Sequence, residues 1–427
     1  AGIAISTPHA ATNIPPATSL IVLGKHAKLT ADNPEVAAAL ALGQGGKVRV
    51  VSYPEVIAEL THGRQTLMVC GSFGKSSTAS LLAHALLHSG VDAGYMIGAR
   101  ALNLPTNSRM GTAAPFVLEG DEYPSSNLDS RAKFAHYTPQ TVLLTSAQHD
   151  HINIFPTHDD YLKPFQSMLA GLTPTALLVV CADDAPALKL SQAAPCRVVT
   201  YGLNGGDYTA EAISYGATTT FTLVQRGKPL GQLDTTQLGA HSVQNALGVA
   251  ATVLENTLLT FAQLQAALPA FLGVKRRLDR LTPPDKLPMY EGFGSSADKA
   301  KAAIAAIKLH YPRHRLVVVF EPHTFSWRNK ATLNSWYDTT FTKVDELYVY
   351  PPPTHGAETH AQLSQTDILE HLKTATTATL HALEFNSLAS NLNIILSNTQ
   401  ADDVILMLTS GDLGGLIEKL PQAVLTS

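Results

Sequence analysis

The stretch "LMVCGSFGKSST", Leu67 to Thr78, decides which kind of fold this sequence predicts. An apolar run typical of a strand enters a glycine-rich turn, and a helix is expected to begin at Lys75. Such a turn directs backbone N–H groups and the helix dipole towards one point, which favours phosphate. The common loop G-x-x-x-x-G-K-[ST] would need a glycine at position 69, where Val69 stands. Either this is a shortened phosphate loop, with Lys75 on the β/γ-phosphates and Ser76 on Mg²⁺, or it is a tight turn without a ligand. The strand–turn–helix context favours the phosphate site.

Strand-like apolar runs alternate with Ala/Leu-rich helical segments through most of the chain. Continuous apolar runs separated by helices indicate parallel sheets that are buried on both faces. The sequence therefore predicts an α/β fold of two or three domains with parallel sheets; the family resemblance described below implies that these sheets are Rossmann-like and that the phosphate loop lies in a central domain. Residues 208–236 read as a small β insertion with a hairpin, and "LTPPDKLP" (281–288) reads as a proline-rich linker before a C-terminal block. The predicted strands are 19–24, 66–70, 115–120, 141–145, 176–181, 315–321, 346–350 and 403–411.

The composition excludes several classes of protein. The chain has 427 residues, of which 45% are hydrophobic and 15% are charged, and its formal net charge is -4. This charge provides no basic surface for nucleic acid, and no run of Lys and Arg suggests binding to a membrane surface. No apolar stretch approaches the roughly 20 residues of a membrane span, and the first ten residues do not resemble a signal peptide. The three cysteines have unrelated spacings, so a reduced, cytoplasmic protein is the expectation.

Acidic and imidazole side chains follow two of the predicted strands. "LEGDEY" places Glu119, Asp121 and Glu122 after one strand, and "SAQHDHINIF" places Asp150 and His151 after the next. The carboxyl ends of parallel strands meet at one edge of the sheet, so these residues are expected to lie near the phosphate loop. A carboxylate and an imidazole there would complete the ligands of a second Mg²⁺. Each cluster alone is also typical of a solvated loop.

Two further motifs precede the proline-rich segment: "HSVQN" (241–245) and "GVKRRLDRL" (273–281). Arg276 and Arg277 are candidates for stabilising a phosphoryl group during its transfer. A solvated helix end is the alternative interpretation of the same two residues.

Taken together, these motifs resemble those of the Mur ligases, the ADP-forming amide ligases of peptidoglycan assembly. Gly71, Gly74, Lys75, Ser76 and Ser77 match the family's short loop G-T-x-G-K-[ST]-[ST], with Ser72 in place of Thr. The segments 119–122, 150–151 and 273–277 resemble its E-A-D-E, D-H and G-V-K-R-R motifs, and His241 and Asn245 match its H-N-x-x-N. "EGDEYPSSNLDSRAKFAHYTPQ", "EPHTFSWRN" and "TSGDLGGL" are most similar to the murein peptide ligase and UDP-N-acetylmuramate–alanine ligase branch.

The resemblance implies a function and a set of roles. ATP would phosphorylate a substrate carboxylate, and an amine would displace the phosphate to form an amide. The substrates would be a UDP-N-acetylmuramate-type molecule and an amino acid or short peptide, in peptidoglycan synthesis or recycling. The implied catalytic residues are Lys75, Arg276, Arg277 and His151. The implied nucleotide-binding residues are Gly71, Ser72, Gly74, Lys75, Ser76, Ser77, His241 and Asn245, and the implied Mg²⁺ ligands are Ser76, Glu119 and His151.

The resemblance also implies three domains: a remnant or truncated UDP-binding domain (1–62), a central ATP-binding domain (63–283) and a C-terminal Rossmann-like domain (284–427). The family's first glycine turn has no counterpart before "SLIVLG" (19–24). Its C-terminal motif Y-D-D-[FY]-[AG]-H-H-P reads "YEGFGSSA" (290–297), with Gly292 in place of an Asp that binds ribose. Phe73, Ser146 and Gln148 are further departures. These departures leave a second hypothesis open, a homologue without ligase activity that serves as a binding or regulatory protein. The sequence indicates neither the amine substrate nor the oligomeric state.

Overall fold

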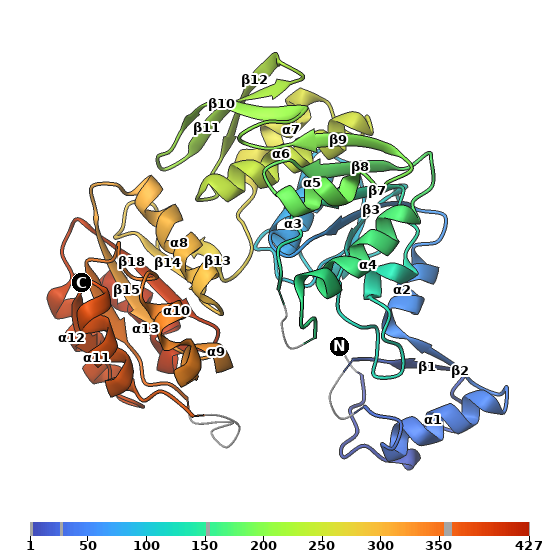
Figure 1. The fold of residues 1–427 in the computed structure, drawn as a ribbon, viewed down its shortest axis with the longest axis horizontal. Coiled ribbons are helices and arrows are strands. Elements are labelled where there is room, and N and C mark those ends of the chain that lie inside the picture. The colour runs from blue at the N-terminus through green and yellow to red at the C-terminus, as the bar shows by residue number, and fades with distance from the viewer. Residues whose placement is uncertain (1–2, 26–28, 151–153, 354–360, 427) are drawn as a thin grey trace.

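The computed structural model describes residues 3–25, 29–150, 154–353 and 361–426. Its strands form three sheets of two, ten and six strands, in chain order (Figure 1). The predicted α/β class with parallel sheets is confirmed. We call the ten-stranded sheet and its helices the central lobe, and the six-stranded sheet and its helices the C-terminal lobe.

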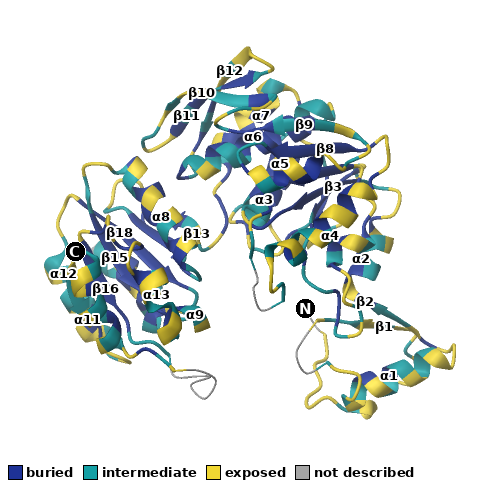
Figure 2. Cartoon of the chain, in the orientation of Figure 1, coloured by how far each residue is buried: buried dark blue, intermediate teal, exposed yellow. Residues whose placement is uncertain are grey.

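The first part of the chain forms a small parallel pair, β1 (Leu20–Leu23) with β2 (Arg49–Ser52), and α1 (Pro34–Gln44) connects the two strands. Most of its residues are exposed or half-buried, in contrast to the buried strands of the large sheets (Figure 2). A capping box between Ser52 and Glu55 starts α2 (Tyr53–Leu60), which leads into the central lobe.

The central sheet has the strand order β12-β11-β10-β9-β8-β7-β3-β6-β4-β5. Side chains alternate along β3: Leu67 and Val69 pack on the face covered by α3, α6 and α7, whereas Met68 and Cys70 pack on the face covered by α4 and α5. This burial on both faces explains why β3 reads as a continuous apolar run. The strands are β3 (Gln65–Cys70), β4 (Gly94–Met96), β5 (Ser108–Arg109), β6 (Pro115–Glu119), β7 (Thr141–Leu144), β8 (Leu177–Cys181) and β9 (Arg197–Tyr201). The helices are α3 (Lys75–His88), α4 (His158–Ala170), α5 (Ala185–Ser191), α6 (Ala240–Glu255) and α7 (Phe261–Ala267).

The strand order reverses at β3, because β6 lies on one side of it and β7 on the other, both parallel to it. Open α/β sheets bind ligands beyond the carboxyl ends of their strands at such a reversal. The glycine-rich turn follows β3 directly, so the topology places it at the expected binding edge.

The β insertion extends the central sheet instead of standing apart from it. It comprises β10 (Tyr208–Ser214), β11 (Thr219–Gln225) and β12 (Lys228–Thr235), which are antiparallel to one another, and β10 joins β9 through the pair Tyr208 and Tyr201. The predicted hairpin is β11–β12. Its two turn residues, Arg226 and Gly227, both have positive φ, as a two-residue hairpin turn of the type I′ kind requires.

The C-terminal sheet has the order β13-β14-β18-β15-β16-β17, and only β13 runs antiparallel to its neighbour. Helices α8 to α11 cover one face, and α12 and α13 cover the other. The strands are β13 (Arg277–Arg280), β14 (Met289–Phe293), β15 (Arg315–Phe320), β16 (Glu346–Val349), β17 (Thr379–Ala382) and β18 (Asp403–Thr409). The helices are α8 (Ala297–His310), α9 (Phe325–Arg328), α10 (Leu333–Tyr337), α11 (Gln365–Ala375), α12 (Leu388–Asn398) and α13 (Leu416–Thr426).

The proline-rich segment 281–288 lies inside this sheet. It connects β13 to β14, which pair with each other, and the chain has already left the central sheet before Arg277. The prolines end the strand as expected, but they form a loop between paired strands and not a connection between the two large sheets. Within the described residues, no helix combines the length and the apolar composition needed to cross a bilayer.

Candidate functional site

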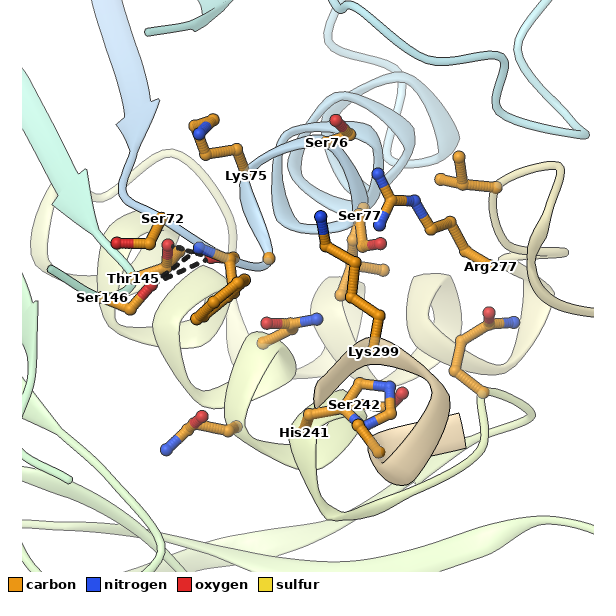
Figure 3. Close-up of a pocket in the computed structure, with 18 of the residues that line it drawn as sticks. Ser72, Lys75, Ser76, Ser77, Thr145, Ser146, His241, Ser242, Arg277 and Lys299 are labelled. Carbon is orange, nitrogen blue, oxygen red and sulfur yellow. Dashed lines mark hydrogen bonds between the residues drawn. The ribbon is translucent and has the colours of Figure 1, made fainter. Parts of the chain in front are cut away.

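A cavity of about 630 Å³ lies between the central and C-terminal lobes. Its size suits a small-molecule ligand. The lining comes from the glycine-rich turn, the ends of β6 and β7, the start of α6, the strand β13 and the start of α8 (Figure 3). Most of the predicted site residues meet here: Ser72, Gly74, Lys75, Ser76, Ser77, Glu119, His241, Asn245, Arg276 and Arg277. His151 lies outside the described residues.

The glycines of the turn are required by its backbone. Gly71 and Gly74 have φ values of 134° and 82°, which side chains other than glycine rarely adopt. A Cβ at Gly71 would come within 2.4 Å of Thr145 Oγ1 and 2.7 Å of the Ser146 backbone. Gly74 is the N-cap of α3 and has no side chain to cap the helix. The first N–H groups of α3 therefore remain available to an anion.

The turn is held from the neighbouring strand. Thr145 and Ser146 follow β7, and Ser146 Oγ accepts a 2.8 Å hydrogen bond from the Phe73 N–H while Thr145 Oγ1 donates to the Phe73 carbonyl (Figure 3). Ser72 N donates to the Ser146 carbonyl at 3.1 Å. These bonds fix the loop before any ligand arrives, which lowers the cost of ordering it on binding.

Lys75 is held in an ion pair. Its Nζ lies 2.9 Å from Glu122 Oε2, and it also donates to the Gly71 carbonyl. Glu122 is only 1% exposed, and the Tyr161 hydroxyl donates to its Oε1 at 3.2 Å. Desolvation and the Glu122 charge raise the pKa of Tyr161, so this hydroxyl keeps its proton. The structure thus shows the lysine held by an acid at the rim of the cavity.

Ser76 and Glu119 lie together beside the loop. The Ser76 hydroxyl donates to Glu119 Oε1 at 2.8 Å, and the Gly98 N–H donates to Glu119 Oε2 at 2.7 Å. Val69 on β3 is the register partner of Glu119 on β6, which explains why the carboxylate arrives at this point. A hydroxyl after a loop lysine and an acid at the end of the adjacent strand are the pair that holds Mg²⁺ in other phosphate-loop proteins.

In the described residues, no three His, Cys, Asp or Glu side chains gather closely enough to bind a metal ion by themselves. Mg²⁺ usually takes only one or two protein carboxylates and completes its coordination with water and phosphate oxygens. The oxygens of Ser76 and Glu119 fit that requirement, so their metal role stays a prediction that the local chemistry supports.

The two arginines have different environments. Arg276 Nε lies 2.7 Å from Glu291 Oε1, and the guanidinium also donates to the Gly411 carbonyl. Arg277 faces the cavity with its guanidinium 5.5 Å from the Phe293 ring centroid, and it extends towards Ser76 and Ser77 in Figure 3. The Arg277 side chain is open to the cavity solvent, but the protein around the cavity lowers its pKa by desolvation, and the Glu119 charge raises it. Arg276 is therefore held by its own sheet, although it too lines the cavity and lies 5.6 Å from the Phe293 ring centroid. The phosphate role of both arginines stays a prediction, and the ion pair of Arg276 favours Arg277 for it.

A β-bulge directs Arg277 into the cavity. The register of β13 on β14 shifts between Arg277 and Asp279, and Arg276 and Leu278 on either side have φ values of 65° and 60°. Positive φ in such residues costs on the order of 1–3 kcal/mol each and persists only where the surroundings enforce it. Bulges of this kind turn a side chain away from the ordinary alternation of the strand.

His241 and Asn245 lie one turn apart on α6, so both reach the same side of the cavity. Burial, with a smaller contribution from His310, lowers the pKa of His241 to about 4. The ring is accessible to the cavity solvent, but the protein enclosing the cavity keeps the imidazole neutral at pH 7. A Cβ at Gly74 would lie 3.2 Å from Asn245 Oδ1, so the glycine lets this amide approach the loop. A neutral ring and an amide suit a heterocyclic base better than a phosphate.

Comparison with known proteins agrees with this geometry. The Mur ligase middle domain matches residues 69–253, which run from β3 into α6. A UDP-N-acetylmuramate–L-alanine ligase from Desulfosudis oleivorans is 31% identical, and the match spans 76% of this chain and 68% of that protein. The chain belongs to the Mur ligase family.

Two solved structures extend the similarity of fold across nearly the whole chain. The UDP-N-acetylmuramate–alanine ligase of Thermotoga maritima has a TM-score of 0.75 at 21% identity, covering 98% of this chain and 88% of its own. A murein peptide ligase from Psychrobacter arcticus has a TM-score of 0.62 at 22% identity, covering 99% and 89%. The predicted resemblance to the Mur ligases is confirmed, and the α/β architecture of this chain is that of the family.

Sequence reasoning about this Mur ligase missed several residues that shape the site. Thr145 and Ser146 hold the loop, yet only the departure of Ser146 from the family motif drew attention to this segment. Tyr161 lies on α4, outside the motifs, and nothing in its local sequence signals its contact with Glu122. Lys299 lines the cavity from α8, where the sequence reads as an ordinary helix.

Gly292 lies where the family motif has an acid. It lines the cavity, and a Cβ there would come within 2.9 Å of Leu408 Cδ2. An aspartate at position 292 would thus require the Leu408 side chain on β18 to move, whereas glycine leaves room for it.

Proposed function

We propose that this chain is an ADP-forming ligase that joins an amino acid or short peptide to a UDP-N-acetylmuramate-type substrate with ATP, in peptidoglycan synthesis or recycling. One arrangement carries the proposal: a glycine loop with Lys75 and Ser76, adjacent to Glu119, in a cavity that Arg277 enters from the other lobe. The relatives named above are all ligases. The rival hypothesis of a homologue without activity has no comparable support, because none of these relatives is described as inactive.

The phosphate end of ATP fits the loop. The free N–H groups of α3 point to the β-phosphate position, and Lys75 exchanges Glu122 for phosphate oxygens when the nucleotide binds. Mg²⁺, when bound at Ser76 and Glu119, spreads the charge of the triphosphate. His241 and Asn245 hold the base side of the nucleotide.

The proposed reaction has two steps. A carboxylate oxygen of the muramate-type substrate attacks the γ-phosphorus, the bond to the bridging oxygen breaks, and ADP leaves. The amine nitrogen then attacks the acyl carbon, inorganic phosphate leaves, and the amine loses a proton. Arg277 stabilises the charge on the phosphoryl group in the first step, as cations placed at transferring phosphoryl groups do.

The division into three domains, drawn at 1–62, 63–283 and 284–427, remains part of this proposal, with UDP binding assigned to the first. Since β13 (Arg277–Arg280) belongs to the C-terminal sheet, the boundary between the second and third lies before Arg277. A cytoplasmic location is proposed with it, because ATP and UDP-linked precursors are cytoplasmic metabolites. His151 retains its proposed place among the metal ligands and catalytic residues.

The test is ADP release in the presence of Mg²⁺-ATP and UDP-N-acetylmuramate, with L-alanine in one reaction and L-alanyl-γ-D-glutamyl-meso-diaminopimelate in another. Release that needs both substrates, with a ligated product seen by mass spectrometry, supports the proposal and names the amine. ATP binding without any turnover on either amine would favour the non-catalytic homologue. No ATP binding by the folded protein would overturn the proposal.

A further inference from the structure

Lys299 lies in the cavity without an assigned role. It occupies the first turn of α8 and lines the cavity opposite the glycine loop. In Figure 3 its side chain extends from α8 towards Ser77 and the Arg277 guanidinium. Of the described residues from Met289 onward that line the cavity, Lys299 alone carries a positive charge.

The Lys299 amine is not committed to another group. In the described part of the chain, no hydrogen bond or ion pair engages its Nζ, whereas Lys75 is paired with Glu122. Two acids of the cavity have other partners: Glu119 accepts from Ser76 and Gly98, and Asp121 pairs with Lys133. Two more acids of the lining, Asp150 and Asp298, attract the Lys299 amine through their charge. A half-buried amine of this kind would normally find a partner, because burial without one is costly.

The cations near Lys299 favour the binding of an anion beside it. Burial lowers the pKa of Lys299, the Asp150 charge raises it, the charges of Arg277 and Lys75 lower it, and the Asp298 charge raises it. The positive charges of Lys75 and Arg277 therefore repel that of Lys299 across the cavity. Like charges brought together repel unless an anion lies between them. The helix dipole of α8 also disfavours a lysine in its first turn and favours an anion there.

We propose that Lys299 binds the terminal phosphate of the bound nucleoside triphosphate from the C-terminal lobe, opposite Lys75. The inference rests on the proposed function, and it adds a contact that no motif of the sequence assigns. Because Lys299 belongs to the C-terminal lobe and Lys75 to the central lobe, only a nucleotide with a third phosphate links both. The site thereby distinguishes ATP from ADP.

The experiment measures the affinities of Mg²⁺-ATP and Mg²⁺-ADP by titration calorimetry, without the other substrates. The proteins are the parent chain, Lys299→Met, Lys299→Arg and the control Lys301→Met. Lys301 lies two residues further along α8, outside the cavity lining, and its replacement makes the same change of charge.

We expect Lys299→Met to weaken ATP binding by about ten- to a hundredfold, the usual effect of losing a charged hydrogen bond. ADP binding should change less than about threefold, Lys299→Arg should keep most of the ATP affinity, and Lys301→Met should bind both nucleotides like the parent. If Lys299 had only a structural role, its replacement would weaken the binding of ATP and of ADP to the same extent.

Unchanged ATP affinity in Lys299→Met, or equal losses for ATP and ADP, would overturn this inference and leave the proposed function standing. If the folded parent protein bound neither nucleotide, the proposed function would fail first and this inference with it.

Discussion

Lys75 Nζ lies 2.9 Å from Glu122 Oε2, and this carboxylate is one of the most buried charges of the central lobe. Glu122 follows β6 and Lys75 follows β3, so the pair joins the ends of two adjacent strands. A triphosphate that enters the loop must compete with Glu122 for the lysine. The ion pair therefore holds the lysine in place and also opposes ligand binding.

Replacing Glu122 separates these two effects. Glu122→Gln keeps the acceptor for the Tyr161 hydroxyl but removes the charge, so we expect a loss of about 1–3 kcal/mol in stability. ATP affinity should rise, by up to about tenfold, because phosphate no longer competes with a carboxylate. Thermal unfolding with and without ATP measures both. Tyr161→Phe is the control, since it removes the hydroxyl and leaves the charge. A fall in ATP affinity in Glu122→Gln would instead make Glu122 part of the binding site.

The role of Lys75 is tested by Lys75→Met in the Glu122→Gln background, which avoids a buried unpaired carboxylate. We expect ATP affinity at least about tenfold weaker than in Glu122→Gln alone, since a charge-assisted hydrogen bond to phosphate is lost. Calorimetry measures it. Lys163→Met is the matched control, because Lys163 pairs with Asp160 on the exposed face of α4. If both variants bound ATP equally well, the loop lysine would have no part in nucleotide binding.

Arg276 and Arg277 should respond differently to the same substitution. Arg276→Met leaves Glu291 buried without its cation, which typically costs about 3–5 kcal/mol, and Glu291→Met in the same chain should restore part of it. Arg277→Met should leave the unfolding temperature nearly unchanged and lower kcat by about 10³-fold or more, as loss of an arginine at a transferring phosphoryl group does. Equal stability losses in both variants would remove the distinction between them.

Asp279 predicts a dependence of stability on pH. Burial, and then the charge of Glu291, raises the pKa of Asp279 from 3.8 to about 6. The folded chain therefore holds a proton that the unfolded chain has released between about pH 4 and 6, so stability falls as pH rises through this window. The loss at pH 7 amounts to up to about 3 kcal/mol.

Asp279→Asn keeps an oxygen acceptor for the Arg276 N–H, which donates to Asp279 at 2.6 Å. We expect its unfolding temperature to exceed that of the parent at pH 7.5, and the difference to shrink as the pH falls and to vanish only below about pH 4. Thermal unfolding at a series of pH values gives the difference, in which titrating groups that do not interact with Asp279 cancel. A constant difference across the series would show that Asp279 does not titrate in this range.

Much of the fold could be read from the sequence. Every strand predicted from an apolar run exists within one or two residues of its expected ends. In the two large sheets the reason is that a strand buried on both faces has apolar side chains at every position; β1 is apolar although it is partly exposed. The strands that escaped prediction, such as β2 and β9, are half exposed and carry polar residues. The proline-rich segment was placed correctly as a break. Its position inside a sheet was not predictable, because the pairing of β13 with β14 is a long-range choice.

The sequence by itself determined the family, the glycine loop and the candidate residues for a phosphate site, because these depend on local backbone geometry and on chemistry carried within a few residues. Only the tertiary structure decided that Arg276 pairs with Glu291 while Arg277 does not, that Glu122 holds Lys75, and that Lys299 reaches the cavity from the other lobe. Those outcomes depend on a bulge, on the register of adjacent strands and on the packing of two lobes. They are set by contacts between residues far apart in the chain, and no local pattern encodes such contacts.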